Sequence, residues 1–181
     1  MEVVQSSLKD CFYLKPSVFE DKRGIFSETY NHKLFVEATG LNINFVQDNQ
    51  SVSKYGVLRG LHFQKGMMAQ AKLVRVALGC VLDIVVDLRK DSETFGKSFA
   101  LELTAENGLQ LFVPKGFAHG FVTLSETSIF CYKCDNFYDK TSESGIIYND
   151  ATLNLNWHLA KEELIISEKD RALPSFNEII Q

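Results

Sequence analysis

The sequence has little of what marks a secreted, membrane-spanning or disordered chain. Its 181 residues include only three prolines and four cysteines. So few cysteines argue against a disulfide scaffold, and so few prolines, with no low-complexity run, leave no linker between domains. Lysine and arginine form no cluster and the formal net charge is −4, which argues against a nucleic-acid polymer as partner. We therefore expect one domain that spans residues 1–181.

Long hydrophobic runs are also missing. The N-terminal stretch MEVVQSSLKDCF has no basic region followed by an apolar one, so it does not resemble a signal peptide. The most apolar segment, residues 72–88, is interrupted by Arg75 and Asp83, which predicts buried strands rather than a membrane span. A soluble, cytoplasmic protein without a membrane partner is expected.

The only closely spaced cysteine pair is Cys131 and Cys134. No second pair or nearby histidine completes a zinc site, and residues three apart on a strand face opposite sides. We interpret both as core thiols.

Short strand-like stretches are abundant instead, and glycines separate them at fairly even intervals, which predicts an all-β sandwich or barrel. The expected strands are residues 11–15, 25–30, 44–53, 57–64, 72–78, 80–88, 98–104, 109–114, 120–124 and 128–134. Helix is sparse. One is expected over residues 31–40, with Asn31 as N-cap and Gly40 at its end, and a second short one begins at Ser167.

The spacing of glycine and histidine resembles the two sequence motifs of the cupin superfamily, which is a small β jelly roll. Metal-dependent cupins bind a divalent ion through His-x-His, a Glu and a distant His. The matching positions here are His62, Gln64, Lys72 and His119. An ammonium at a carboxylate position repels a cation, and two imidazoles alone hold a metal poorly. No metal and no other cofactor is expected.

Longer motifs resemble the dTDP-4-dehydrorhamnose 3,5-epimerase family of the rhamnose pathway. They run in order from about residue 12 to residue 174 and include DKRGIFSETY, VQDNQSVSKYGVLRGLHFQ, LFVPKGFAHGF, YKCDNFY and SEKDRA. The resemblance implies an all-β, cupin-type jelly roll with a few short peripheral helices. It also implies dTDP-4-dehydro-6-deoxy-D-glucose as substrate, inverted at C3 and C5.

This chemistry explains the residue types. The protons on C3 and C5 are acidic because each carbon flanks the C4 ketone. Inversion needs a base on one face, an acid on the other, and a cation at the keto oxygen for the enolate. By resemblance, His62 is the base, since an imidazole titrates near neutral pH. Asp170 orients His62, Tyr132 is the acid, and Lys72 stabilises the enolate.

The same resemblance implies a set of substrate-binding residues. Arginine forks suit the diphosphate, Tyr138 matches the aromatic that stacks on thymine, and Asp83 with His119 forms a second polar pair lining the cavity. The full set is Arg23, Glu28, Gln47, Asn49, Arg59, Lys72, Asp83, His119, Tyr138, Glu143 and Lys169, with Phe19 a weaker candidate. The family is homodimeric with exchanged strands, so Arg23 and Glu28 are expected to serve the partner subunit's site.

Other functions and simpler roles remain open from the sequence. A mono-epimerase acting at C3 or C5 alone would keep the same His, Lys and Tyr. A metal-dependent cupin oxygenase or isomerase conflicts with Gln64 and Lys72, and a non-catalytic sugar-binding cupin would have lost the acid or the base. Tyr132 could serve core packing, and Asp170 could merely cap a helix.

Overall fold

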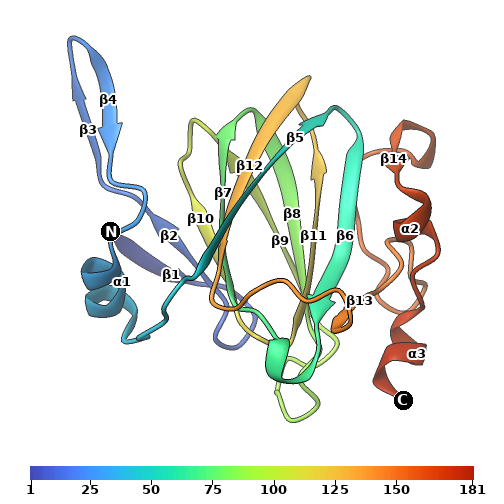
Figure 1. Ribbon diagram of the computed structural model, residues 1–181. Helices are drawn as coiled ribbons and strands as arrows, with labels where there is room; N and C mark the ends of the chain where they lie inside the picture. Colours follow the sequence, from blue (N-terminus) through green and yellow to red (C-terminus); the bar gives the residue numbers. More distant parts are fainter.

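The computed structural model describes residues 1–181 as a β jelly roll with short helices at its periphery (Figure 1). One sheet has the strand order β1-β2-β10-β7-β12-β5 and the other has the order β13-β6-β11-β8-β9, with β14 beside β6. The strands are β1 Glu2–Gln5, β2 Phe12–Lys15, β3 Val18–Asp21, β4 Gly24–Ser27, β5 Gln47–Lys54, β6 Val57–Gln64, β7 Lys72–Leu78, β8 Cys80–Asp87, β9 Ser98–Thr104, β10 Gln110–Val113, β11 Phe117–Thr123, β12 Thr127–Cys134, β13 Glu143–Gly145 and β14 Ile165–Ile166. The helices are α1 His32–Thr39, α2 Glu168–Arg171 and α3 Phe176–Ile180, with single 3₁₀ turns at Gly66–Met68 and Lys161–Glu163.

The hydrophobic core has three parts, and together they leave one end of the barrel free for polar side chains. Between the sheets, inward-facing residues such as Val74, Val85 and Phe130 fill the interior. Outside the β6-β11-β8 sheet, the C-terminal segment packs Trp157 and Ile166 against that sheet. Strand β8 is therefore buried on both faces, which explains its nearly continuous apolar sequence. The third cluster lies under α1, around Phe35.

The hairpin of β3 and β4 projects away from the barrel (Figure 1). Its apolar side chains Val18, Phe19, Ile25 and Phe26 are 53–71% exposed. Strand β5 is an edge of its sheet, so one side of its backbone has no neighbouring strand. Exposed apolar surface and free sheet edges of this kind are normally covered by association with another protein chain.

Several elements confirm the sequence-based expectations. Strands β6, β7 and β9 have the expected bounds, and α1 is capped by Asn31 and ends at Gly40, whose φ of 73° suits glycine. Four short strands and α3 were not expected. Both cysteines of the pair are free, but only Cys134 is buried, whereas Cys131 is half-buried on the outer face. The longest α-helix has eight residues, so no helix here could cross a bilayer.

Candidate active site

A cavity of about 320 Å³ opens at the polar end of the barrel, between the two sheets. Strands β5, β7 and β12 supply one wall, β6 and β11 supply the opposite wall, and the α2 region closes one side. Its lining is Ser51, Arg59, His62, Lys72, His119, Phe121, Phe130, Tyr132, Ser167, Lys169 and Asp170. The four expected catalytic residues therefore surround a single space.

A close approach of two glycines shapes the wall that carries the histidines. A Cβ on Gly60 would lie 2.5 Å from the Cα of Gly120, and Gly60 has a φ of 128°. Here the β6–β11 register shifts, and this irregularity lets Arg59 and His62, three residues apart, line the same cavity. Next to it, His62 and His119 are directly paired across the two strands.

His62 is held by a carboxylate from the far end of the chain. Its Nε2 lies 2.8 Å from the Oδ1 of Asp170, and the other oxygen of Asp170 accepts the Gly60 N–H at 3.2 Å. Burial alone would raise the pKa of Asp170, but the hydrogen bonds from His62 and Gly60 outweigh it and hold this pKa below the usual value. Asp170 is therefore an anion beside the imidazole, able to stabilise its protonated form.

The helix α2 explains the position of Asp170. Ser167 is the N-cap of this helix, and its hydroxyl accepts a hydrogen bond from the N–H of Asp170, the third helical residue. In a capping box, a carboxylate at this third position would accept a hydrogen bond from the backbone N–H of the N-cap. The carboxylate of Asp170 instead reaches His62 and is 4% exposed. The helix-capping interpretation of Asp170 alone is therefore insufficient.

Tyr132 and Lys72 lie on the opposite wall. Burial raises the pKa of the Tyr132 phenol, which keeps it protonated, as a proton donor must be. Burial lowers the pKa of the Lys72 ammonium, which takes part in no salt bridge or hydrogen bond and lies 6.0 Å from the centroid of the Tyr132 ring. A half-buried cation without an anionic partner is placed to receive an oxyanion from a ligand.

A second polar pair stands behind the cavity wall. Nε2 of His119 lies 2.9 Å from Oδ2 of Asp83, and both side chains are buried. His119 lines the cavity, but Asp83 does not, which departs from the expectation that both would. Asp83 can act only through His119, because its carboxylate has no exposed surface.

The cavity continues into a polar groove. His62, Lys72 and Tyr132 line both, and the groove adds Gln47, Asn49, Tyr138 and Glu143. The Tyr138 hydroxyl donates to Oε2 of Glu143 at 2.9 Å, and the Lys169 ammonium contacts the same oxygen at 2.6 Å. Tyr138 is 54% exposed, so its ring is open to a ligand.

Two expected binding residues lie elsewhere. Arg23 is on the projecting hairpin, where its guanidinium pairs with Asp21 at 2.6 Å, and Glu28 is exposed after β4. Neither lines the cavity or the groove. Phe19 lies on the same hairpin and lines neither the cavity nor the groove. It lines only a pocket of the hairpin itself.

Sequence reasoning missed residues that line the cavity or support it. Phe121 and Phe130 stack at 4.1 Å between ring centroids and form its floor, and Ser51 has a buried hydroxyl without a hydrogen-bond partner. Alternation along β5 could have found Ser51, because it follows Asn49 on the same face. Gln64 lines the groove, as its alternation with His62 on one strand indicates, but its bonds to the loop have no signal in the sequence.

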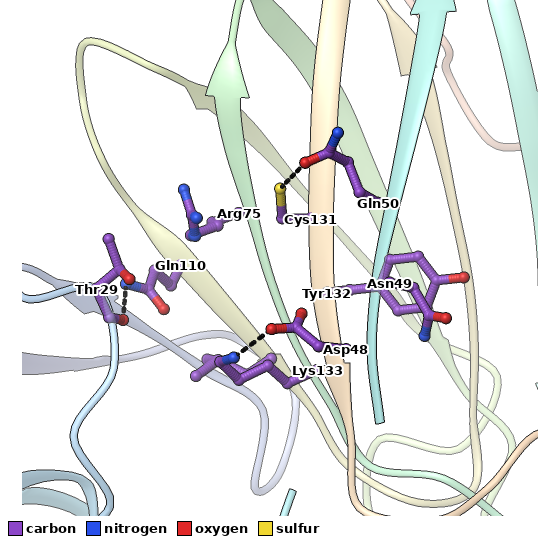
Figure 2. Close-up of a pocket in the computed structure, with 10 residues that line it drawn as sticks. Thr29, Asp48, Asn49, Gln50, Arg75, Gln110, Cys131, Tyr132 and Lys133 are labelled. Atoms are coloured by element: carbon purple, nitrogen blue, oxygen red, sulfur yellow. Dashed lines mark hydrogen bonds and ion pairs between the residues drawn. The ribbon is translucent and has the colours of Figure 1, made fainter. Parts of the chain in front are cut away.

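A further groove lies on the outer face of the first sheet (Figure 2). Arg75 and Cys131 line it, and its edge includes Asn49 and Tyr132, whose side chains belong to the inner face because residues alternate along a strand. The Lys133 ammonium there is paired with Asp48 at 2.6 Å. This groove has no imidazole, and its one carboxylate is the Asp48 group paired with Lys133, so we assign the chemistry to the inner cavity.

The residues do not fit the metal centre of metal-dependent cupins. Gln64 is bonded through its carboxamide to backbone groups, Lys72 places an ammonium where a carboxylate would bind, and no group of three potential His, Cys, Asp or Glu ligands converges anywhere. The donor set is that of proton-transfer chemistry: an imidazole held by a carboxylate, faced by a phenol and an ammonium.

A jelly roll with this cavity defines a cupin-type enzyme of the carbohydrate epimerase class. Residues 5–178 match the family described as dTDP-4-dehydrorhamnose 3,5-epimerase, so the chain belongs to that family. The enzyme of that name from Salmonella typhimurium is 48% identical over 99% of this chain and 98% of its own length. The one from Elizabethkingia anophelis has a crystal structure that is 57% identical, covers 100% of this chain and 99% of its own, and superimposes with a TM-score of 0.95.

A third relative was solved with a ligand. The dTDP-6-deoxy-D-glucose-3,5-epimerase from Legionella pneumophila, in complex with dTDP-4-keto-L-rhamnose, is 40% identical. The match covers 98% of this chain and 94% of that one, with a TM-score of 0.94. The expected fold class and family are thus confirmed.

Proposed function

We propose that this chain inverts C3 and C5 of dTDP-4-dehydro-6-deoxy-D-glucose, as the step before a reductase forms dTDP-L-rhamnose. The single observation that carries this assignment is the pairing of His62 with Asp170 on one wall, opposite Tyr132 and Lys72 on the other. A base and an acid on opposite sides of one space are what inversion at a carbon requires.

Each inversion follows the same sequence of proton transfers. His62 removes the proton next to the ketone, and Asp170 stabilises the imidazolium that results. The electron pair moves into the enolate, whose oxygen is stabilised by the Lys72 ammonium. Tyr132 then delivers its phenolic proton to the opposite face of the carbon. Before the next inversion, the imidazolium releases its proton to solvent and the phenolate takes one up from solvent. No redox cofactor takes part, because every step is a proton transfer, and the Lys72 ammonium supplies the positive charge that a metal ion would otherwise bring to the enolate oxygen.

The groove beside the cavity is assigned to the nucleotide. Tyr138 offers an exposed ring for the thymine, and its hydroxyl is anchored by Glu143 and Lys169. Arg59, at the cavity, is positioned by the Ser53 hydroxyl at 3.1 Å and can pair with a phosphate oxygen. Gln47, Asn49 and His119 supply further hydrogen-bonding groups to the ligand.

The active form is a homodimer with exchanged strands in the cytoplasm. The apolar β3–β4 hairpin of one copy would cover the free β5 edge of the other and carry Arg23 and Glu28 toward the partner's site. We expect sedimentation equilibrium to give twice the chain mass of 20.5 kDa. The double variant Ile25→Glu/Phe26→Glu should be monomeric and weakly active, whereas Lys22→Glu on the same hairpin should stay dimeric. A monomeric wild type would contradict the exchange.

The reaction itself is tested by incubating the wild-type protein with dTDP-4-dehydro-6-deoxy-D-glucose in D₂O. We expect deuterium at both C3 and C5, read by NMR, and a product that a rhamnose-forming reductase accepts. Deuterium at one carbon would instead identify a mono-epimerase of another deoxysugar route. No deuterium at either carbon would favour a binding protein.

A further inference from the structure

We infer that Gln64 is a positioning residue for nucleotide binding: it fixes the loop that presents the Tyr138 ring to the thymine. The inference rests on the proposed role of Tyr138. Gln64 lies two residues after His62 on β6, so both side chains leave the strand on the same side. Gln64 is 6% exposed and forms part of the groove wall.

The carboxamide of Gln64 bonds almost entirely to loop backbone. Its Nε2 donates to the carbonyl of Phe137 at 3.0 Å and to that of Met68 at 2.6 Å, and its Oε1 accepts the N–H of Asp139 at 2.6 Å. Phe137 and Asp139 are the two neighbours of Tyr138. One side chain therefore holds the backbone on both sides of the aromatic residue.

Side chains of other residues also anchor this loop. The Tyr138 N–H is held by Oε1 of Gln47 at 2.9 Å, and the Asn136 carbonyl accepts from Gln70 at 2.9 Å. The loop has no regular secondary structure over residues 137–139, so these side chains take the place of a ladder of backbone hydrogen bonds. Gln64 is the member that joins the loop to the strand of the catalytic base.

This arrangement separates two effects of losing Gln64. The carboxamide does not line the cavity that holds His62 and Asp170, so proton transfer does not depend on it directly. Without Gln64, however, the loop would have to become ordered each time a nucleotide binds. The entropy cost of this ordering would weaken the affinity for the nucleotide. Substitution should thus weaken binding while the rate at saturating substrate changes little.

The test uses Gln64→Met, which keeps an unbranched side chain of similar length and removes all three hydrogen bonds. We expect the Kd for dTDP, measured by calorimetry, and the KM for the sugar nucleotide each to rise about tenfold. The kcat should change less than about threefold. Gln5→Met, on the far edge strand β1 where the side chain makes no hydrogen bond, is the matched control and should leave all three constants unchanged.

A double-mutant cycle with Tyr138→Ala identifies the route of the effect. If Gln64 acts through Tyr138, the double variant binds dTDP no more weakly than Tyr138→Ala alone. Additive losses, or a kcat that falls as far as KM rises, would overturn the inference. Gln64→Glu, which keeps the acceptor for Asp139 but turns a carboxylate toward two carbonyls, repeats the test if the Met variant does not fold.

The outcomes also separate this inference from the function it rests on. If Tyr138→Ala weakens dTDP binding and Gln64→Met does not, the inference is wrong and the role of Tyr138 stands. If Tyr138→Ala itself leaves dTDP binding unchanged, the assignment of the groove to thymine is wrong. Neither result alters the deuterium-exchange test of the epimerase reaction.

Discussion

Replacing His62 with alanine should abolish deuterium incorporation at both C3 and C5. The imidazole of His62 lies opposite Tyr132, and its Nε2 is 2.8 Å from Asp170, which can stabilise the imidazolium. General-base catalysis is worth about 10² to 10⁴ in rate, and we expect a loss at the upper end of that range because both inversions use this base. The measurement is NMR of the sugar carbons after incubation in D₂O.

Two comparisons make the His62 result specific. The affinity for dTDP should be nearly unchanged, because the nucleotide groove is formed mainly by other side chains. His32→Ala, at the exposed start of α1, should exchange at the wild-type rate. Exchange that persists at one carbon in His62→Ala would show that a second base serves that carbon, and the directly paired His119, backed by Asp83, would then be the candidate.

Replacing Tyr132 with phenylalanine should separate exchange from inversion. The phenol is kept protonated because burial raises its pKa, and it lies across the cavity from His62. Without it, His62 still removes a proton, but the enolate is reprotonated from the same side. We therefore expect deuterium in the recovered substrate with its configuration retained, and epimerised product formed about 10² to 10³ times more slowly.

The recovered sugar nucleotide distinguishes the possible outcomes. Coupling constants in the proton spectrum report configuration, and mass spectrometry reports the deuterium content. Tyr13→Phe, on β2, is the matched control because its hydroxyl makes no hydrogen bond, and it should behave as the wild type. Normal inversion in Tyr132→Phe would exclude the phenol as the acid and restore its simpler role as a packing residue.

The sequence predicted the central strands because their apolar runs are bounded by glycines. Gly56 precedes β6 and Gly79 separates β7 from β8, so the bounds were visible although neither burial pattern alternates strictly. Strand β3 was missed because all four of its residues are exposed. Without a buried face, its sequence has no alternation of apolar and polar residues. Helix α3 was missed although Ser175 and Glu178 form a capping box that could have indicated it.

The site shows a different limit. Asp170 contacts His62 across 108 positions of sequence, so no local pattern could pair them, and the expectation rested on family resemblance. The position of Asp83 behind His119 was missed because alternation assigns a face to a residue but not its depth below the surface. The bonds of Gln64 were invisible for a related reason: its partners are backbone groups of a loop, which carry no sequence signature.

The origin of Asp170 in the C-terminal segment ties catalysis to one of the less central parts of the fold. Most strands of the two sheets end by Cys134, whereas the carboxylate lies on a later segment that packs over the outside through Trp157 and Ile166. Regions of one native protein open with different free energies, and peripheral segments can detach while the central strands stay paired. Such an opening would leave the imidazole without its anion and stop proton transfer in an otherwise folded molecule. Turnover therefore depends on the docking of the C-terminal segment as well as on the stability of the barrel.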